Sequence, residues 1–504
     1  MKNYIVKINS LDNVAIAVED LPSGTIINEE LTAIEEIPQA HKIALADIPK
    51  GGEIRRYNTI IGYAKEDIKK GRWINQYMVN LPTAPTLNDL EFATNIVTDL
   101  PTPPQNSWWG YRNPKGGPAG TRNLLGIMTT VQCAAGVVKI AAERIRKELL
   151  PKYPNVGDVV PISHEYGCGV AINAPEAKVP IRILQNLVHH PNFGNQIMVV
   201  GLGCEKLTVD KLLLQDEISP QNIIILQEEH GFEGMVSSIM KMAEKKLAIL
   251  NRRKREELPL SDLIVGLQCG GSDSFSGVTA NPSAGYAADM LVKGGATVLF
   301  SEVTEARDGV HLLAHRCINS EVGEKLANEM AWYDQYLKAA NVDRDANPAP
   351  GNKKGGLANI VEKSMGSIAK SGTSPIVQVL SPGEKPKAHG LIYAATPAND
   401  FACGPCQLAS GMGVHVFMTG RGSTYGLAMA PVIKVCSQNK LKNQLFDVID
   451  VNAGPIATGD ATIQSVGTEI FNLIIDVASG KKKTYAEQWK IHNDMCIFNP
   501  APLT

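Results

Sequence analysis

Polar and nucleophilic side chains follow several short apolar runs of this chain, at the points where strands are expected to end. The apolar run 263–267 leads into Cys269-Gly270-Gly271-Ser272-Asp273, and glycines at such an exit let the backbone approach a ligand. Three further runs lead into Gln132-Cys133, His164-Glu165-Tyr166-Gly167-Cys168-Gly169 and Gly203-Cys204-Glu205-Lys206. Ligands of open α/β sheets bind beyond the carboxyl ends of the strands, so these segments are candidate parts of a site.

Together the exits carry groups that can move protons and bind anions. They include the bases His164 and Lys206, the carboxylates Glu205, Asp273, Glu302, Glu305 and Asp400, and the cations Arg122, Lys353, Lys354 and Arg421. Such a set suits proton transfer on a small anionic substrate. This interpretation requires the distant Cys-Gly and His-containing segments to converge at one rim of a parallel sheet.

Other chemistries lack their sequence signals. The chain has no GxSxG nucleophile elbow and no GxGxxG fingerprint with its downstream acidic residue, so neither serine hydrolysis nor a dinucleotide cofactor is indicated. The Gly-rich basic loop before residue 358 lacks the residue order of a nucleotide P-loop. The nine cysteines, an odd number, indicate free thiols rather than a disulfide framework. Cys403-Gly-Pro-Cys406 by itself is only a weak zinc signal.

Apolar periodicity divides the 504 residues into four segments. Residues 1–82 alternate short apolar runs with glycine turns, which predicts a small all-β domain. Residues 83–109 form a proline-rich linker that ends in Trp108-Trp109, an apolar anchor. Residues 110–252 and 253–504 alternate apolar runs with helical patterns, which predicts two mostly parallel-sheet α/β domains. The predicted fold class is therefore α/β, with two such domains preceded by the all-β domain.

Composition narrows the classes of partner. The chain is 44% hydrophobic and 20% charged, with a formal net charge of -2, which gives no electrostatic reason to expect nucleic acid or an acidic membrane. The first residues lack the long apolar core of a signal peptide or a membrane span. We therefore expect a cytoplasmic enzyme that acts on a small molecule, and we expect a homodimer.

Long motifs give a more specific indication. The stretches GYRNPKGGPAGTRNLLGI, VVGLGCEKL, VGLQCGGSDSFSGVTANP, NPAPGNKKGGLANIVEKSMGSIAKSG and GLIYAATPANDFACG resemble the altronate and galactarate dehydratase family of sugar-acid lyases over nearly the whole chain. Residues 1–82, with IPQAHKIALADIPKGGEI, resemble its SAF-type β-clip module. Altronate members end that module in a His-rich segment, whereas this chain reads GRWINQYM at 71–78, which weakens an altronate assignment.

The resemblance implies a hydro-lyase that removes water from meso-galactarate to give 5-dehydro-4-deoxy-D-glucarate, with iron(II) or another divalent cation as cofactor. The proton next to a carboxylate is weakly acidic, so the enzyme must stabilise an enediolate while a base removes that proton. We hypothesise that Lys206 or His164 is the base, and that Arg122 with the Gly270 and Gly271 amides holds the reacting carboxylate. The remaining roles are a hydroxyl or metal contact for Asp273, a site for the second carboxylate at Arg421 or Lys353, and a metal ligand at His41.

Alternatives to these residue roles stay open, as do three alternatives to the function. Each of these residues also has a structural interpretation, such as an ion pair for Arg122 or a simple turn for Gly270 and Gly271. The reaction can instead belong to an iron–sulfur dehydratase in which three of the exit cysteines are thiolate ligands, or act on altronate or glucarate. A non-catalytic protein that binds acidic sugars is the third alternative, and the density of acid and base groups argues against it.

Overall fold

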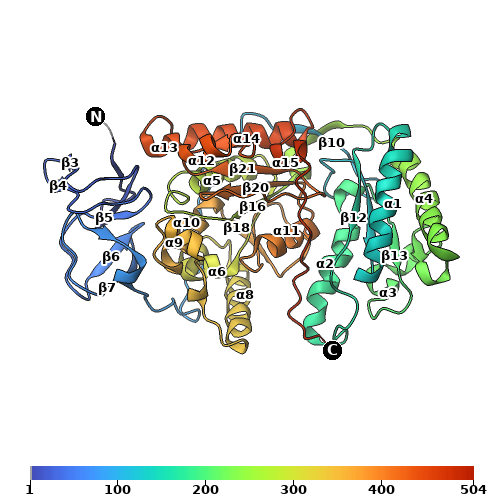
Figure 1. Cartoon of the computed structure of the whole chain (residues 1–504), viewed down its shortest axis with the longest axis horizontal. Helices are drawn as coiled ribbons and strands as arrows, with labels where there is room; N and C mark the ends of the chain where they lie inside the picture. Colours follow the sequence, from blue (N-terminus) through green and yellow to red (C-terminus); the bar gives the residue numbers. More distant parts are fainter. Residues whose placement is uncertain (1–2, 504) are drawn as a thin grey trace.

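The computed structural model describes residues 3–503, in which three units follow one another along the long axis of the molecule (Figure 1). A small β module lies at one end, a unit with a seven-stranded sheet lies in the middle, and a unit with a four-stranded sheet lies at the other end. Every strand pair in the two larger sheets is parallel. The predicted fold class is confirmed.

The β module is built from short strands separated by glycine turns. Gly24, Gly51 and Gly71 adopt positive φ angles of 85°, 80° and 85°, which only glycine adopts at little cost. The strands form sheets of four, three and two members: β1 Ile5–Val6, β2 Val14–Ala17, β3 Ile26–Asn28, β4 Leu31–Thr32, β5 Lys42–Ala44, β6 Glu53–Arg56, β7 Thr59–Ala64, β8 Trp73–Ile74 and β9 Val79–Asn80.

The module is docked on the middle unit through a buried ion cluster. The Glu362 carboxylate accepts from Lys42 Nζ at 2.9 Å and from Arg56 Nη1 at 2.5 Å, and all three side chains are almost completely excluded from solvent. Arg56 also donates to the Ser274 carbonyl oxygen at 2.7 Å. Buried charges are tolerated only when they are paired and hydrogen-bonded, so the module and the middle unit depend on each other here.

The linker that follows has no helix or strand between residues 81 and 106 and lies against the middle unit. Arg307 donates to the Pro85 carbonyl oxygen at 2.9 Å, and the Asn95 amide donates to the His315 carbonyl oxygen at 2.9 Å. At its end, Trp108 is 1% exposed and Trp109 is 46% exposed. Trp108 Nε1 donates to the Pro259 carbonyl oxygen, so Trp108 alone is the apolar anchor.

The end unit has a four-stranded sheet in the order β12-β11-β13-β14. Alternate residues of β11 face opposite layers: Leu125 and Ile127 pack with α1 and α4, whereas Leu124 and Met128 pack on the α2 side, as strand geometry requires. The elements are β10 Ser107–Gly110, β11 Leu124–Thr129, α1 Ala135–Glu148, β12 Asp158–Ile162, α2 Lys178–Val188, β13 Val199–Gly201, α3 Val209–Leu212, β14 Ile223–Ile225, α4 Gly231–Leu250 and β15 Glu256–Pro259. Strand β10 pairs with β15 outside this sheet.

The middle unit has a seven-stranded sheet in the order β18-β19-β17-β16-β20-β21-β22. The chain moves from β16 to one side through β17 and β19, then returns to β20 on the other side, which makes a topological switch point beside β16. Its strands are β16 Ile264–Cys269, β17 Thr297–Phe300, β18 Ile376–Leu380, β19 Gly390–Ala394, β20 Val414–Thr419, β21 Val432–Cys436 and β22 Val451–Asn452.

Helices cover this sheet, and several begin with a side-chain cap. Asn319, Asn359 and Asn399 accept amide protons at the starts of α8, α10 and α11, which fixes where each helix begins. The helices are α5 Ala280–Lys293, α6 Val303–Ala306, α7 Val310–Ala314, α8 Ser320–Ala339, α9 Pro350–Lys354, α10 Ile360–Ile368, α11 Asp400–Ala409, α12 Asn439–Gln444, α13 Pro455–Thr458, α14 Ile463–Ala478 and α15 Tyr485–Gln488.

The segment after α15, residues 489–503, runs between the two α/β units and is called the tail below (Figure 1). The Cys496 amide donates to the Phe401 carbonyl oxygen at 3.2 Å on one side, and the Ile497 amide donates to Glu165 Oε1 at 2.8 Å on the other. Phe498 packs edge-on against Tyr336 of α8, with ring centroids 5.7 Å apart. The tail therefore joins the two units.

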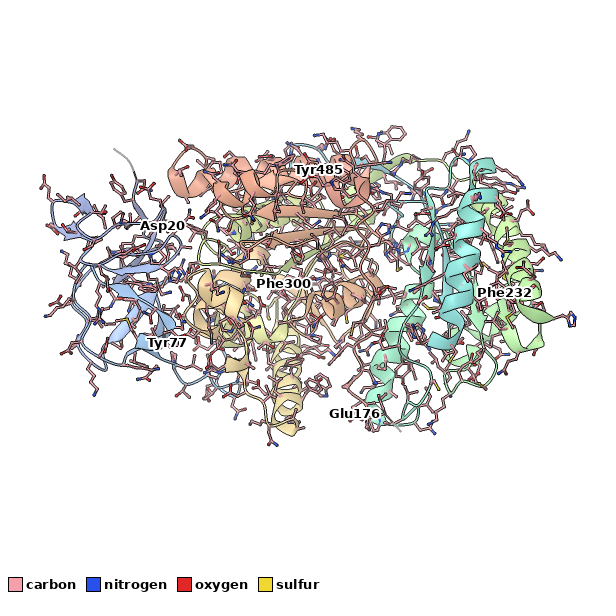
Figure 2. All side chains as sticks on the ribbon, in the orientation of Figure 1. Asp20, Tyr77, Glu176, Phe232, Phe300 and Tyr485 are labelled. Atoms are coloured by element: carbon pink, nitrogen blue, oxygen red, sulfur yellow. The ribbon has the colours of Figure 1, made fainter. Side chains whose placement is uncertain are left out.

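No helix within residues 3–503 combines the length and the apolar character that crossing a membrane requires. Exposed aromatic side chains occur in all three units of the molecule. Tyr77 of the β module and Phe232 of α4 are 78% and 44% exposed and lie far apart, with buried Phe300 between them (Figure 2).

Candidate functional site

A cavity of about 690 Å³ opens at the carboxyl edge of the seven-stranded sheet, at its switch point. Its wall combines segments that follow four strands: 269–271 after β16, 304–305 after β17, 397–401 after β19, and Arg421 after β20. Helix α8 and the segment 342–352 complete it with Tyr333, Arg344, Asn347 and Asn352, and α10 contributes Lys363. This is the position at which α/β sheets bind small ligands.

Asp400 is held at the cavity wall by its neighbours. The Asn399 cap places it in the first turn of α11, and Gln268 Nε2 donates to Asp400 Oδ1 at 2.7 Å. A Cβ atom on Gly270 would lie 2.6 Å and 2.7 Å from the two Asp400 oxygens. Glycine is therefore required at 270, because the carboxylate occupies the space that a side chain would fill. Burial raises the pKa of Asp400, which makes it a stronger base than an exposed aspartate.

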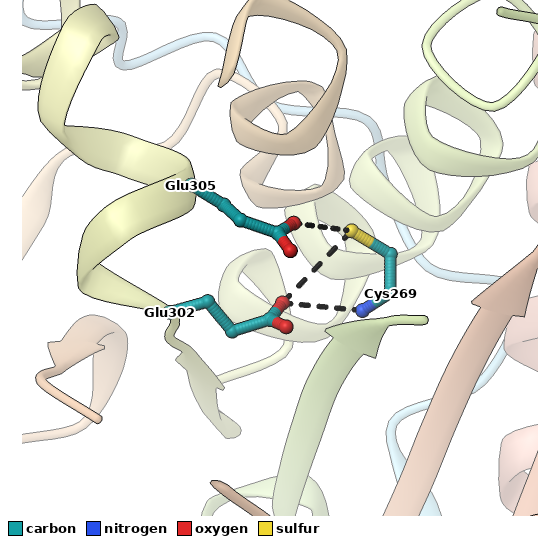
Figure 3. A group of neighbouring side chains, drawn as sticks. All are labelled: Cys269, Glu302 and Glu305. Atoms are coloured by element: carbon teal, nitrogen blue, oxygen red, sulfur yellow. Dashed lines mark hydrogen bonds between the residues drawn. The ribbon is translucent and has the colours of Figure 1, made fainter. Parts of the chain in front are cut away.

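A buried cluster of one thiol, two carboxylates and two ammonium groups extends inward from the wall, to which Cys269, Glu305 and Lys363 belong. Glu302 and Glu305 point toward Cys269 Sγ, and Glu305 Oε2 lies 3.6 Å from the sulfur (Figure 3). Lys370 Nζ is 2.6 Å from Glu302 Oε2, and Lys363 Nζ is 2.7 Å from Glu305 Oε1. The two lysines are seven residues apart, two turns along α10 and the short turn that follows it, so both reach the same side.

The two carboxylates of this cluster titrate differently. Burial raises the pKa of Glu302 to about 8, against the opposing effect of Lys370. Burial also acts on Glu305, but Lys363 and Lys370 outweigh it and lower its pKa. Burial raises the pKa of the Cys269 thiol to about 12. At neutral pH the cluster therefore holds an ionised Glu305, a protonatable Glu302 and a neutral thiol.

Glu302 also has a strained backbone. Its φ angle is 81°, a left-handed conformation that costs a non-glycine residue on the order of 1–3 kcal/mol. It stands directly after Ser301 at the exit of β17 and precedes the first residue of α6. Strain of this kind persists where the surroundings fix it and is typical of functional sites.

The thiol and the two carboxylates have the donor spacing of a metal site, but their charge does not fit one. Within residues 3–503, Cys269, Glu302 and Glu305 form a group whose ligand atoms all lie within 4.8 Å of one another. Lys370 and Lys363 already balance both carboxylates at salt-bridge distance. A divalent cation would have to displace both ammonium groups from a buried site. We therefore derive no catalytic step through a metal at this group.

Three of the predicted binding residues lie at the cavity: Gly270, Gly271 and Arg421. The Gly270 amide donates to the Met418 carbonyl oxygen at 3.0 Å, so its N–H is used by the sheet and not by a ligand. Gly271, with φ at 61°, accepts from the amides of Gly420 and Arg421 through its carbonyl oxygen. This pair of bonds holds Arg421 at the rim, where its exposed side chain reaches the opening.

Arg122 and Asp273 have structural partners in place of the predicted ligands. Arg122 pairs with Glu487 at 2.6 Å and donates to the Val477 carbonyl oxygen at 2.9 Å. Asp273 is 1% exposed and accepts from Ser276, Ser437 and Gln438. Neither residue is part of the cavity wall, because these local partners consume their charge and their hydrogen-bonding capacity.

Lys353 and His41 also lie outside the cavity wall. Lys353 is in α9, whose neighbours Gly351 and Asn352 do line it. His41 Nδ1 accepts from Trp73 Nε1 at 3.0 Å, and its Nε2 donates to the Lys354 carbonyl oxygen at 3.2 Å. Both ring nitrogens are engaged at the contact between the β module and α9, and the predicted metal ligand is therefore separate from the Cys269 cluster.

His164 and Lys206 lie at the carboxyl edge of the other sheet. His164 is 2% exposed, donates from Nε2 to the Thr129 carbonyl oxygen at 2.7 Å, and has a pKa that burial lowers to about 4. Lys206 Nζ donates to the Val170 carbonyl oxygen at 3.2 Å. The prediction of one common rim is wrong, because the exits of residues 203–206 and 269–271 belong to two different sheets.

Sequence reasoning missed Lys363, Lys370 and Arg344. The signal for the lysines was present in VEKSMGSIAK, where two cations spaced by seven residues stand in a helix whose other residues, Glu362 excepted, are small or apolar. Arg344 had no comparable signal, because it lies in a single 3-10 turn, Arg344–Ala346, and pairs with the distant Asp308 at 3.1 Å.

Comparisons with known proteins agree with this architecture. Three family models match in sequence: the altronate/galactarate dehydratase SAF domain over residues 3–82, the second domain of D-galactarate dehydratase/altronate hydrolase over 110–251, and the C-terminal D-galactarate/altronate dehydratase domain over 260–503. The galactarate dehydratase (L-threo-forming) of Escherichia coli strain K12 is 55% identical over 99% of this chain and 98% of its own length.

Two altronate dehydratases are more distant. That of Bacillus subtilis strain 168 is 34% identical over 95% of this chain and 96% of its own length. That of Escherichia coli strain K12 is 33% identical over 95% of each chain. The resemblance drawn from the motifs is confirmed, and this chain belongs to the D-galactarate/altronate dehydratase family.

Proposed function

We propose that this chain is a hydro-lyase that converts meso-galactarate to 5-dehydro-4-deoxy-D-glucarate. The likeness to a galactarate dehydratase, at 55% identity over almost the whole of both chains, is the observation that carries this proposal. The cavity agrees with it chemically, since Arg344, Lys363 and Arg421 surround one space together with Glu305 and Asp400. Such a wall suits a small dianion that must gain and lose a proton.

The cations bind and polarise the substrate. Galactarate carries a carboxylate at each end, and two separated positive groups can hold them at once. Lys363, fixed by Glu305 and by Asn347 Oδ1 at 2.8 Å, lies deep enough to stabilise an enediolate, whereas Arg421 lies at the rim. Preorganised charges of this kind stabilise the transition state without reorganising during the reaction.

Asp400 is the base in this proposal. It removes the proton next to the carboxylate that Lys363 holds, and the electron pair moves into the enediolate. As the enediolate collapses, the hydroxyl on the neighbouring carbon leaves and takes the proton from the Asp400 carboxylic acid, so that water departs. The resulting enol tautomerises to the keto acid. The raised pKa of Asp400 suits both transfers.

A keto-acid assay tests the proposal. Purified enzyme is incubated with galactarate, glucarate and altronate, with and without iron(II), and the 2-keto product is measured. Turnover of galactarate well above the other two supports the proposal. Preference for altronate would move the chain to the activity of its more distant relatives, and turnover of none of the three would refute a dehydratase of these acids.

We further propose that the enzyme acts in the cytoplasm as a homodimer with an iron(II) or similar divalent cofactor. Its family contains metabolic enzymes that act on small sugar acids, which supports the location. Light scattering after gel filtration tests the dimer, and a single monomeric species would refute it. Metal analysis of the purified protein tests the cation.

A further inference from the structure

Three thiols stand at the carboxyl edge of the four-stranded sheet, away from the cavity. Cys133 follows β11, Cys168 follows β12 and Cys204 follows β13, three adjacent strands of that sheet. All three cysteines are free and exposed, in contrast to Cys269 and Cys403, which are buried. Strand β11 has β12 on one side and β13 on the other, so these exits surround the switch point of this sheet, where ligands bind.

The three loops that carry these cysteines contact one another. The amides of Lys206 and Leu207 donate to the Gly167 carbonyl oxygen at 3.0 Å and 3.2 Å. Thr130 Oγ1 donates to Glu205 Oε1. A Cβ atom on Gly167 would lie 2.2 Å from the Thr130 carbonyl oxygen. Each loop therefore touches the other two within three residues of its cysteine.

The backbone beside the thiols is shaped by glycines that no other residue could easily replace. Gly167, Gly169 and Gly203 have φ angles of 117°, 63° and 126°, conformations that L-amino acids rarely adopt. The Glu205 carboxylate accepts from the amides of Leu202 and Gly203 at 3.1 Å and 2.6 Å, which fixes the turn at Cys204. The loops are thus held in place by packing and hydrogen bonds, with their cysteines at the surface.

Positive charge lies beside the three thiols. Cys133 lies in the short turn Gln132–Ala134 that leads directly into the fourteen-residue helix α1, whose first amides have no partner within the helix and carry partial positive charge. The Lys206 ammonium is held between the other two loops on the Val170 carbonyl oxygen. Metals bind cysteine through its thiolate, and positive charge beside the site would offset the negative charge of a thiolate-ligated cluster.

We propose that Cys133, Cys168 and Cys204 bind a 4Fe–4S cluster through three thiolates, which leaves its fourth iron open to an oxygen ligand of a small hydroxy acid. Each thiol loses its proton as its Fe–S bond forms. A set of sulfur donors alone suits an iron–sulfur cluster or zinc. At least two of the three sulfur atoms lie more than 4.8 Å apart, farther than the ligands of one tetrahedral ion with bonds of about 2.3 Å.

The tail connects this thiol site to the cavity. Glu165 and Ala171, on either side of Cys168, bond to the Ile497 amide and the Pro502 carbonyl oxygen. Cys496 bonds to Phe401, a residue of the cavity wall. The presence of the cluster does not rest on the proposed function, whose proton transfers take place in the cavity.

Anaerobic reconstitution of the full chain with iron(II), sulfide and a thiol reductant tests the cluster. The expected result is visible sulfide-to-iron absorption with iron and acid-labile sulfide in equal amounts, about four of each per chain. The variants Cys133→Ser, Cys168→Ser and Cys204→Ser each lose the absorption while keeping the thermal transition of the parent. Cys496→Ser, an exposed cysteine on the tail, is the matched control and keeps it.

The outcomes separate the two proposals. Absence of sulfide from the reconstituted parent, binding of a single zinc or iron ion, or equal loss in Cys496→Ser would each overturn the three-cysteine cluster. Lys363→Met is expected to keep the absorption and lose galactarate turnover. A parent that carries the cluster but turns over none of the sugar acids leaves the cluster standing and refutes the proposed function.

Discussion

The backbone at Gly270 leaves the space in which the Asp400 carboxylate, the proposed base, is held. The carboxylate occupies the space beside Gly270 and is bonded to Gln268 on the same strand. A group held this way keeps one orientation toward the cavity. The exit of β16 therefore acts as the support of the proposed base, and its Gly270 amide is bonded to the neighbouring strand.

Replacing Asp400 by asparagine tests its role as base. The amide preserves shape and the Gln268 contact through its oxygen but cannot accept the substrate proton, so kcat should fall by about 10²- to 10⁴-fold. Steady-state galactarate turnover and a thermal melt measure the two effects. Asp216→Asn, at an exposed position, is the matched control. Near-parental turnover in Asp400→Asn would remove this residue from the base role.

Replacing Gly270 by alanine tests the support without touching the base. The added methyl would lie 2.5 Å from the Phe417 ring and 2.6 Å from Asp400, so it must displace the carboxylate, and kcat should fall while the fold persists. Gly136→Ala is the opposite case, since its Cβ would meet nothing within 4 Å. Gly136→Ala should raise the free energy of unfolding by about 0.5–1 kcal/mol, because alanine favours the helix more than glycine does. Equal kcat for Gly270→Ala and the parent would contradict the positioning argument.

At the scale of elements, helix α10 contacts both the cavity cluster and the β module. Lys363 faces the cavity cluster, and Glu362, one residue earlier, faces the β module and binds Lys42 and Arg56. The Asn359 cap bonds the Glu362 amide and also donates from Nδ2 to the Ile61 carbonyl oxygen of the module. The position of α10, and with it Lys363, depends on the docked module.

Glu362→Gln should destabilise the chain strongly. It leaves Lys42 and Arg56 buried without a counter-charge, which costs about 3–5 kcal/mol. Glu53→Gln removes an exposed partner of Arg55 and should cost less than about 1 kcal/mol. Denaturant unfolding of both variants gives the comparison. Similar losses for the two would show that the buried cluster contributes little to docking.

The strands were more predictable from the sequence than the contacts between residues that are distant along the chain. The apolar runs expected before Gln132 and Gly203 contain β11 and β13, and the run 263–267 contains most of β16, because buried parallel strands are short apolar runs. Arg122 could not be interpreted in the same way, since its partner Glu487 is 365 residues away. The contact of His41 with the Lys354 carbonyl oxygen likewise depends on docking of the β module. Local patterns predicted strand exits, whereas long-range packing decides which exits share a cavity.

At the scale of the whole molecule, buried neutral histidines in both α/β units link stability to pH. Burial lowers the pKa of His164 and His190 to about 4 and that of His415 to about 3. The unfolded chain therefore binds more protons than the folded chain below about pH 6.5. The stabilisation linked to these histidines is fully present above that pH, and it is lost as the pH falls toward their pKa values in the folded chain.

For each such histidine, the free energy of unfolding should be about 2 kcal/mol lower at pH 5 than at pH 7. His415 offers the clearest test, because neither of its ring nitrogens has a hydrogen-bond partner among residues 3–503 and its ring packs on Phe417 and Tyr425. His415→Phe removes the protonation and should reduce the acid-induced loss by that amount. Denaturant unfolding at the two pH values measures it. An unchanged loss would show that other groups control acid stability.

Hydrogen exchange of the tail amides is expected to report how often the two α/β units separate. Its amides at Asn493, Cys496 and Ile497 each donate to a different neighbour: the Gly426 carbonyl, the Phe401 carbonyl and the Glu165 side chain. Because no regular secondary structure shields this segment, its amide protons can exchange with deuterated solvent once those neighbours release them. Their exchange times, followed by mass spectrometry, therefore depend on how often the tail loses its hydrogen bonds to the two α/β units.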